Sequence, residues 1–102
     1  MGASIAFYEA LGLDMLFGGP AAQLTSFACG TGFVNLIPAP DADAIRWWGR
    51  VILHVDDVDA VHERALRAGL SPEAPPRDAE WGERYFHITD PDGHELSIAR
   101  PL

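Results

Sequence analysis

Lysine is missing from this sequence, and cysteine occurs only once, as Cys29. Without lysine, the chain has no residue for Schiff-base formation or for general-base catalysis by an amine. A single cysteine excludes a disulfide within the chain and a cysteine-rich zinc site. It also favours a reducing compartment, so we expect a cytoplasmic protein.

Positive charge is scarce as well. Seven arginines stand against 15 acidic residues, which gives a net charge of −8 when the histidines are neutral. Nucleic acids and anionic membranes bind basic surfaces, so neither is expected as a partner. The sequence also lacks an apolar run near the roughly 20 residues that a membrane-spanning helix needs. Its first residues carry no basic side chain, so we expect no secretory signal.

The remaining composition is typical of a folded, globular protein. Hydrophobic residues make up 48% of the chain and charged residues 22%, which is enough apolar surface for a core. A length of 102 residues fits one domain rather than two packed cores. We therefore expect a single domain over 1–102 that needs no disulfide for stability.

The first half of the chain reads as one helix followed by three strands. Ser4 is a suitable helix N-cap, apolar residues follow at helical spacing, and Gly12 suits the end of the helix. Three strand-like segments come next, separated by glycine-containing turns; they cover 15–18, 23–28 and 33–37. We take 1–40 as an N-terminal half-module and 41–49 as a linker.

The second half, 50–102, repeats this order with an additional strand at its start. A strand is expected at 50–55, and Asp57 is then positioned to cap a helix that ends at Gly69. A strand at 81–89, a turn at 90–93 and a last strand at 94–99 follow. The chain is therefore predicted to be an α+β protein with two β-α-β-β-β-type modules, the first of which lacks its opening strand.

This order and several short strings resemble the glyoxalase / bleomycin-resistance protein / extradiol dioxygenase superfamily, whose members are also called vicinal oxygen chelate proteins. The strings span almost the whole chain; they are SIAFYEALGL (4–13), HVDDV (54–58), and WG followed by DPDGH (81–94). The resemblance implies a curled mixed sheet in which each module forms half of an open barrel. It also implies a divalent metal held by residues on the first and last strand of each module.

Only one strong metal ligand is found when those positions are transferred to this sequence. The first position would lie on the opening strand that the first module lacks. Asn35 takes the second position, His54 the third and Ser97 the fourth, with Glu95 two residues earlier on the same strand. Asparagine and serine are poor ligands for zinc, nickel or iron. We therefore expect no bound metal, although a non-standard site of His54, His87 and Glu95 is left open.

Strand alternation predicts which side chains line the ligand cavity. Phe86, Ile88, Leu96 and Ile98 are expected to pack beneath the helices, because successive side chains point to opposite faces of a strand. The cavity would then be lined by the residues on the other face. Those candidates are Asn35, His54, Tyr85, His87, Glu95 and Ser97, and Trp47 and Trp48 are added as either an aromatic wall for a ligand or a dimer contact.

Three functions remain open on these grounds. The first is a metal-free protein that binds a small molecule, and the second is a metal-dependent lyase, isomerase or dioxygenase whose missing ligands come from a partner chain. The third is an accessory interaction module. We also expect a homodimer, because the absent strand leaves an unpaired sheet edge that invites pairing with a second copy.

Overall fold

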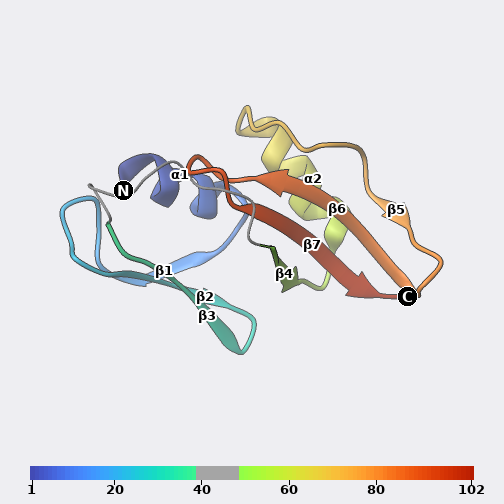
Figure 1. Cartoon of the computed structure of the whole chain (residues 1–102), viewed down its shortest axis with the longest axis horizontal. Helices are drawn as coiled ribbons and strands as arrows, with labels where there is room; N and C mark the ends of the chain where they lie inside the picture. Colours follow the sequence, from blue (N-terminus) through green and yellow to red (C-terminus); the bar gives the residue numbers. More distant parts are fainter. Residues whose placement is uncertain (39–48) are drawn as a thin grey trace.

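The computed structural model describes residues 1–38 and 49–102 as two helices and two sheets (Figure 1). The first unit consists of α1 (Gly2–Ala10), β1 (Asp14–Phe17), β2 (Thr25–Cys29) and β3 (Gly32–Leu36). The second consists of β4 (Arg50–His54), α2 (Val58–Arg67), β5 (Arg77–Asp78), β6 (Glu83–Thr89) and β7 (Glu95–Pro101). The predicted α+β class is confirmed.

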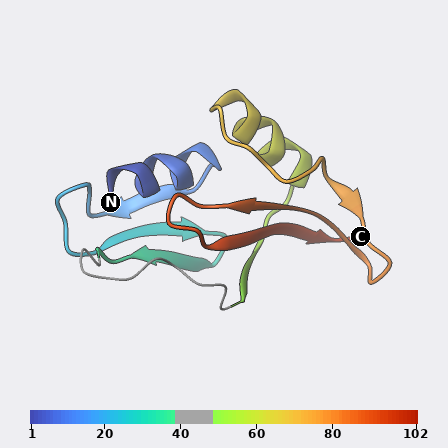
Figure 2. The same cartoon turned by 45° about the horizontal axis from the view of Figure 1, so that its top comes forward.

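Among the described residues, the first sheet has three strands and the second has four. The first has the order β1-β2-β3, and all its pairs are antiparallel. The second has the order β4-β7-β6-β5, in which β4 runs parallel to β7 and the other pairs are antiparallel. Both helices lie on the same side of the sheets (Figure 2), so the opposite side of each sheet carries no helix from residues 1–38 or 49–102.

The core lies between the helices and the sheets. Helix α1 contributes apolar side chains to it, and Tyr8 contacts the ring of Phe27 on β2. On the second sheet, the side chains predicted to pack beneath the helices are each at most 3% exposed. These are Phe86, Ile88, Leu96 and Ile98.

A turn of the second unit holds the first helix in place. Asp90 accepts hydrogen bonds from the backbone N–H groups of Asp92 and His94, at 3.0 and 2.8 Å, and so shapes the turn between β6 and β7. Its second oxygen accepts a 2.8 Å hydrogen bond from the hydroxyl of Tyr8 on α1. Burial, and then the Asp90 carboxylate, raise the pKa of Tyr8 far above its usual range. The Tyr8 hydroxyl therefore remains a donor at any physiological pH.

The predicted cap at Ser4 is wrong. Helix α1 starts at Gly2, so Ser4 lies inside it, and its Oγ donates a 3.0 Å hydrogen bond to Asp92. Contact with a distant turn has here outweighed the local preference of serine for a helix end. The cap at Asp57 is confirmed, since its side chain accepts from the backbone N–H of Ala60 at 3.0 Å.

No helix within the described ranges is long and apolar enough to span a membrane. The linker predicted at 41–49 lies almost entirely outside those ranges, and so do Trp47 and Trp48.

Candidate functional site

The side of the second sheet that faces away from α2 brings together most of the predicted site residues. We call this side the open face. Strand register places its side chains in rows: Ile52 lies beside Ser97, which lies beside His87. In the next row His54 lies beside Ala99, which pairs with Tyr85 and then Arg77.

Small side chains form the middle of the open face. Ser97 and Ala99 lie on β7, the strand between β4 and β6, and are only 6% and 1% exposed. Larger side chains flank them on both sides, with His54 on β4 and Tyr85 on β6. The larger neighbours therefore cover the small residues, and a ligand on this face would contact mainly the taller side chains.

Aromatic rings lie in a row on β6 and just before it. The rings of Trp81 and Tyr85 are 5.5 Å apart, and those of Tyr85 and His87 are 5.0 Å apart. The guanidinium of Arg77 lies 4.4 Å from the centre of the Tyr85 ring, and its Nε donates to the Tyr85 hydroxyl at 3.0 Å. These contacts fix the orientation of Tyr85.

Glu73 joins two of these residues into one network. Its Oε1 lies 3.3 Å from Nη2 of Arg77, and its Oε2 lies 3.3 Å from Nδ1 of His87. The hydrogen bond with His87, together with the charge of Arg77, holds the pKa of the Glu73 carboxyl below its usual range. Glu73 therefore stays ionised and orients the imidazole of His87, which leaves the other ring nitrogen, Nε2, on the far side of the ring from this contact.

A second carboxylate, that of Glu83, contacts the other histidine of the open face. Oε2 of Glu83 lies 3.4 Å from Nε2 of His54, and Oε1 accepts a 2.8 Å hydrogen bond from the indole of Trp81. Arg50 and Glu95 form an ion pair of 3.3 Å at the beginning of their strands. The open face therefore presents two imidazoles, each beside a carboxylate, around a centre of small side chains.

Five of the eight predicted ligand-binding residues share this face: His54, Tyr85, His87, Glu95 and Ser97. Asn35 lies on β3 of the other sheet, where it is exposed and pairs with Ser26 of β2. Sequence reasoning missed Glu73 and Arg77, because the proline-rich stretch around them shows no strand alternation. Arg77 belongs to a strand of two residues, which is too short to leave a periodic signal.

The donors on the open face do not form the cluster that a transition metal requires. Within the described residues, one group of three or more ligand atoms lies within 4.8 Å: that of Asp90, Asp92 and His94, at the turn beside α1. Both oxygens of Asp90 already accept hydrogen bonds there. On the open face, His54 has Glu83 as a neighbour, and His87 has Glu73. The residues present at the positions implied by the family therefore do not fit a resident metal.

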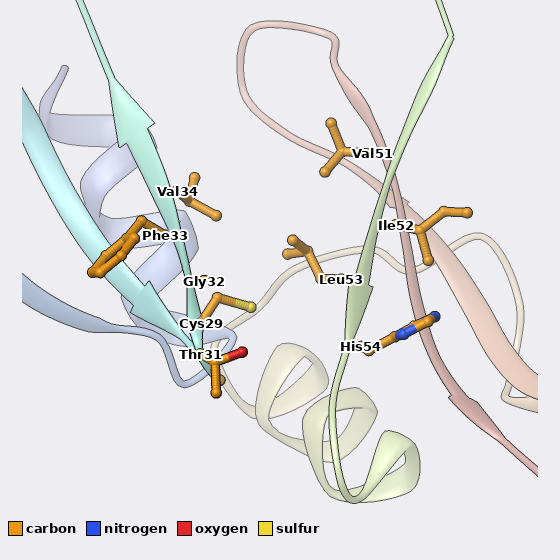
Figure 3. A pocket seen from close by; sticks show the side chains of 10 residues that line it. Cys29, Thr31, Gly32, Phe33, Val34, Val51, Ile52, Leu53 and His54 are labelled. Carbon is orange, nitrogen blue, oxygen red and sulfur yellow. The ribbon is translucent and has the colours of Figure 1, made fainter.

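A cleft of about 500 Å³ separates the two sheets (Figure 3). It is lined by 29–34, which include the start of β3, and by Val51, Ile52, Leu53 and His54 of β4. Val34 and Leu53 point into it, whereas Ile52 and His54 point away toward the open face (Figure 3). Burial raises the pKa of the Cys29 thiol, so this cysteine is a poor nucleophile.

Comparison with known proteins gives one family. The family model described as "Glyoxalase/Bleomycin resistance protein/Dioxygenase superfamily" matches residues 1–98. An uncharacterised protein of Mycobacterium bovis is 44% identical over 50 residues, which are 49% of this chain and 33% of that protein. The match thus spans about a third of the length of that relative.

Solved structures resemble this chain in fold over nearly its full length. Lactoylglutathione lyase from Agrobacterium tumefaciens is 26% identical, with a TM-score of 0.71 over 96% of this chain and 83% of that one. A bleomycin-binding protein solved in complex with bleomycin is 23% identical, with a TM-score of 0.76 over 98% and 88%. These similarities support the same fold throughout the described residues.

Proposed function

Because the chain belongs to the glyoxalase/bleomycin resistance protein/dioxygenase superfamily, we propose that it binds a small organic molecule on the open face and needs no metal to do so. The observation that carries this proposal is the two rows of larger, accessible side chains, with His54 on one and Tyr85 and His87 on the other, that flank the small residues of β7. Ligand sites combine apolar contact surface with a few oriented polar groups. Here His54 and His87 are oriented by carboxylates and would supply the polar contacts.

Ligand screening by NMR tests the location of the site. A library of small aromatic and heteroaromatic compounds is added to isotope-labelled protein, and hits are expected to shift the amide signals of Ile52, Tyr85 and Ala99. His87→Ala should weaken those hits at least tenfold. His62→Ala is the matched control, because that histidine lies on α2 against Phe86, on the other side of the sheet. Hits confined to the helix side, or equal binding by the two variants, would refute the proposal.

Metal content is the first specific prediction. Protein purified without chelator should contain far less than one transition-metal ion per chain, because the described donors do not assemble a three-residue site on the open face. Elemental analysis measures this directly. About one nickel, zinc, iron or manganese per chain, lost in His54→Ala, would contradict it.

That contrary result would favour a second function, a metal-dependent lyase, isomerase or dioxygenase. The observation behind it is the pair of His54, which is exposed, and Glu83, which is half-buried; the pair offers one imidazole and one carboxylate 3.4 Å apart. A partner chain would then have to supply the remaining ligands. In the metal-free proposal the same pair simply orients His54 toward the bound molecule.

The proposed assembly is a homodimer, and the proposed compartment is the cytoplasm. Exposed apolar side chains support the dimer, because Phe17, Phe33 and Ile37 are 56%, 68% and 71% exposed. Exposed large apolar side chains are enriched at protein interfaces. The single cysteine supports a reducing compartment.

A further inference from the structure

The hydrogen-bond donors of the open face are already engaged within the protein. The indole N–H of Trp81 donates to Glu83 at 2.8 Å. Two nitrogens of the Arg77 guanidinium donate to Tyr85 and Glu73, and the third, Nη1, is buried. The Tyr85 hydroxyl accepts from Arg77 and keeps one proton of its own to donate. The acceptors of a ligand would therefore find few donors on this face that are free to bind them.

A carboxylate determines which ring nitrogen of His87 carries the proton. A neutral imidazole has one N–H group and one nitrogen that accepts. Oε2 of Glu73 lies 3.3 Å from Nδ1 of His87, and this hydrogen bond, with the charge of Arg77, holds the pKa of the Glu73 carboxyl below its usual range. An ionised carboxylate can only accept, so the proton of the neutral ring is on Nδ1. Nε2 is then left as an acceptor.

Nε2 of His87 is also accessible. Within residues 1–38 and 49–102, the contact with Glu73 is the one side-chain hydrogen bond found for this imidazole. In the same part of the chain, the buried side-chain nitrogen or oxygen atoms that lack a partner reduce to one, Nη1 of Arg77. The unpartnered Nε2 is therefore not buried, although only 17% of the His87 side chain is exposed. It presents a lone pair that a ligand can reach.

His54 has a similar arrangement on the other side of the open face. Oε2 of Glu83 lies 3.4 Å from Nε2 of His54, and its negative charge favours the proton on that nitrogen. Nδ1 then remains as the acceptor of a side chain that is 62% exposed. Arg50, the other cation of this face, is paired with Glu95 at 3.3 Å. Because β7 separates β4 from β6, the two imidazoles present their acceptors from strands about 10 Å apart.

We propose that the open face selects ligands that carry N–H or O–H donors, such as amidines or hydroxylated rings, and rejects carboxylates. This inference rests on the proposed function, because it names the class of molecule that the face binds. A donor of the ligand would bind Nε2 of His87. A carboxylate in the same place would face that lone pair and the nearby charges of Glu73 and Glu83, which oppose its binding. The net charge of −8 acts against anions as well.

A shape-matched pair of probes tests this selection. Benzamidine presents two nitrogen donors where benzoate presents two oxygens, on the same phenyl ring. NMR titrations are made at pH 8, where imidazole side chains are ordinarily neutral. We expect benzamidine to shift the amide signals of Ile52, Tyr85 and Ala99 with a Kd at least tenfold lower than that of benzoate. Resorcinol and 1,3-dimethoxybenzene repeat the comparison without charge, and resorcinol should bind more tightly.

The tautomer of His87 is a second readout that needs no ligand. Its ring ¹⁵N shifts should place the proton on Nδ1. In Glu73→Gln the side-chain amide can donate to Nδ1, so the tautomer with the proton on Nε2 should gain population, and the preference for benzamidine over benzoate should fall at least fivefold. Glu63→Gln is the matched control, because it removes the same charge from α2, where Glu63 is 73% exposed and pairs with Arg67. The control should change neither readout.

The outcomes separate the donor preference from the location of the site. Equal binding of both members of each probe pair on the open face would refute the preference and leave the proposed function intact. A His87 proton on Nε2 in the unmodified chain would also refute the preference alone. Probe shifts confined to the helix side, or no shifts from any of the probes, would count against both.

Discussion

At the scale of single residues, the hydrogen bond between Tyr8 and Asp90 joins the two halves of the chain. The aspartate is 5% exposed and the distance is 2.8 Å, so water does not readily replace the donor. Tyr8→Phe should lower the free energy of unfolding by about 1.5–3 kcal/mol, the usual range for a hydrogen bond to a charged group. Urea denaturation measures the change.

Tyr85→Phe is the matched control for this prediction. It removes the same atom, but the Tyr85 hydroxyl accepts from Arg77 on the open face, where the side chain is only half-buried. The loss there should be below about 1 kcal/mol, because water can hydrate the guanidinium. Equal losses in the two variants would mean that burial of Asp90 does not strengthen the bond.

At the scale of the elements, the two faces of the second sheet should respond differently to truncation. Phe86→Ala should cost about 3–5 kcal/mol and Leu96→Ala about 2–5 kcal/mol, because each leaves a cavity in the packed core. His87→Ala should cost about 1 kcal/mol or less, since its half-buried side chain lies on the open face. Chemical denaturation checks this, and the reverse order of losses would contradict the face assignment.

Which side chains of β6 and β7 are buried could be predicted from the sequence. Successive side chains of a strand point to opposite faces, so the apolar ones at every second position face the core. Phe86, Ile88, Leu96 and Ile98 are buried as their spacing indicates. Contacts between distant segments leave no such local pattern. Ser4 reads as a helix cap because serine favours that position, and only its contact with Asp92, 88 residues away in sequence, explains why it lies inside α1.

The same limit applies to the site. His54, Tyr85 and His87 were assigned to one face by alternation. Glu73 could not be assigned in this way, because it lies outside the strands, in the segment between α2 and β5. The path of that segment brings its carboxylate to His87. Alternation predicts Ser97 on the cavity wall, but the larger neighbours on both sides leave it only 6% exposed.

At the scale of the whole molecule, we expect two copies to associate. Light scattering at micromolar concentration should give twice the chain mass of 11.1 kDa. Phe33→Ser should shift the protein toward the monomer if the exposed apolar side chains of the first sheet form the contact. Trp81→Ser is the control, because Trp81 is also 68% exposed but lies beside the second sheet, against Tyr85 of β6. A monomeric mass for the unmodified chain would exclude the dimer.

The position of β7 has a consequence for how the protein is made. It is the last described strand to leave the ribosome, yet it lies between β4 and β6 in its sheet. Strand β4 emerges about 45 residues earlier and has no described partner in that sheet until β7 is synthesised. The nascent second unit therefore cannot close its sheet until residues 95–101 have emerged. Its apolar strand segments stay exposed up to that point, or are covered by a chaperone.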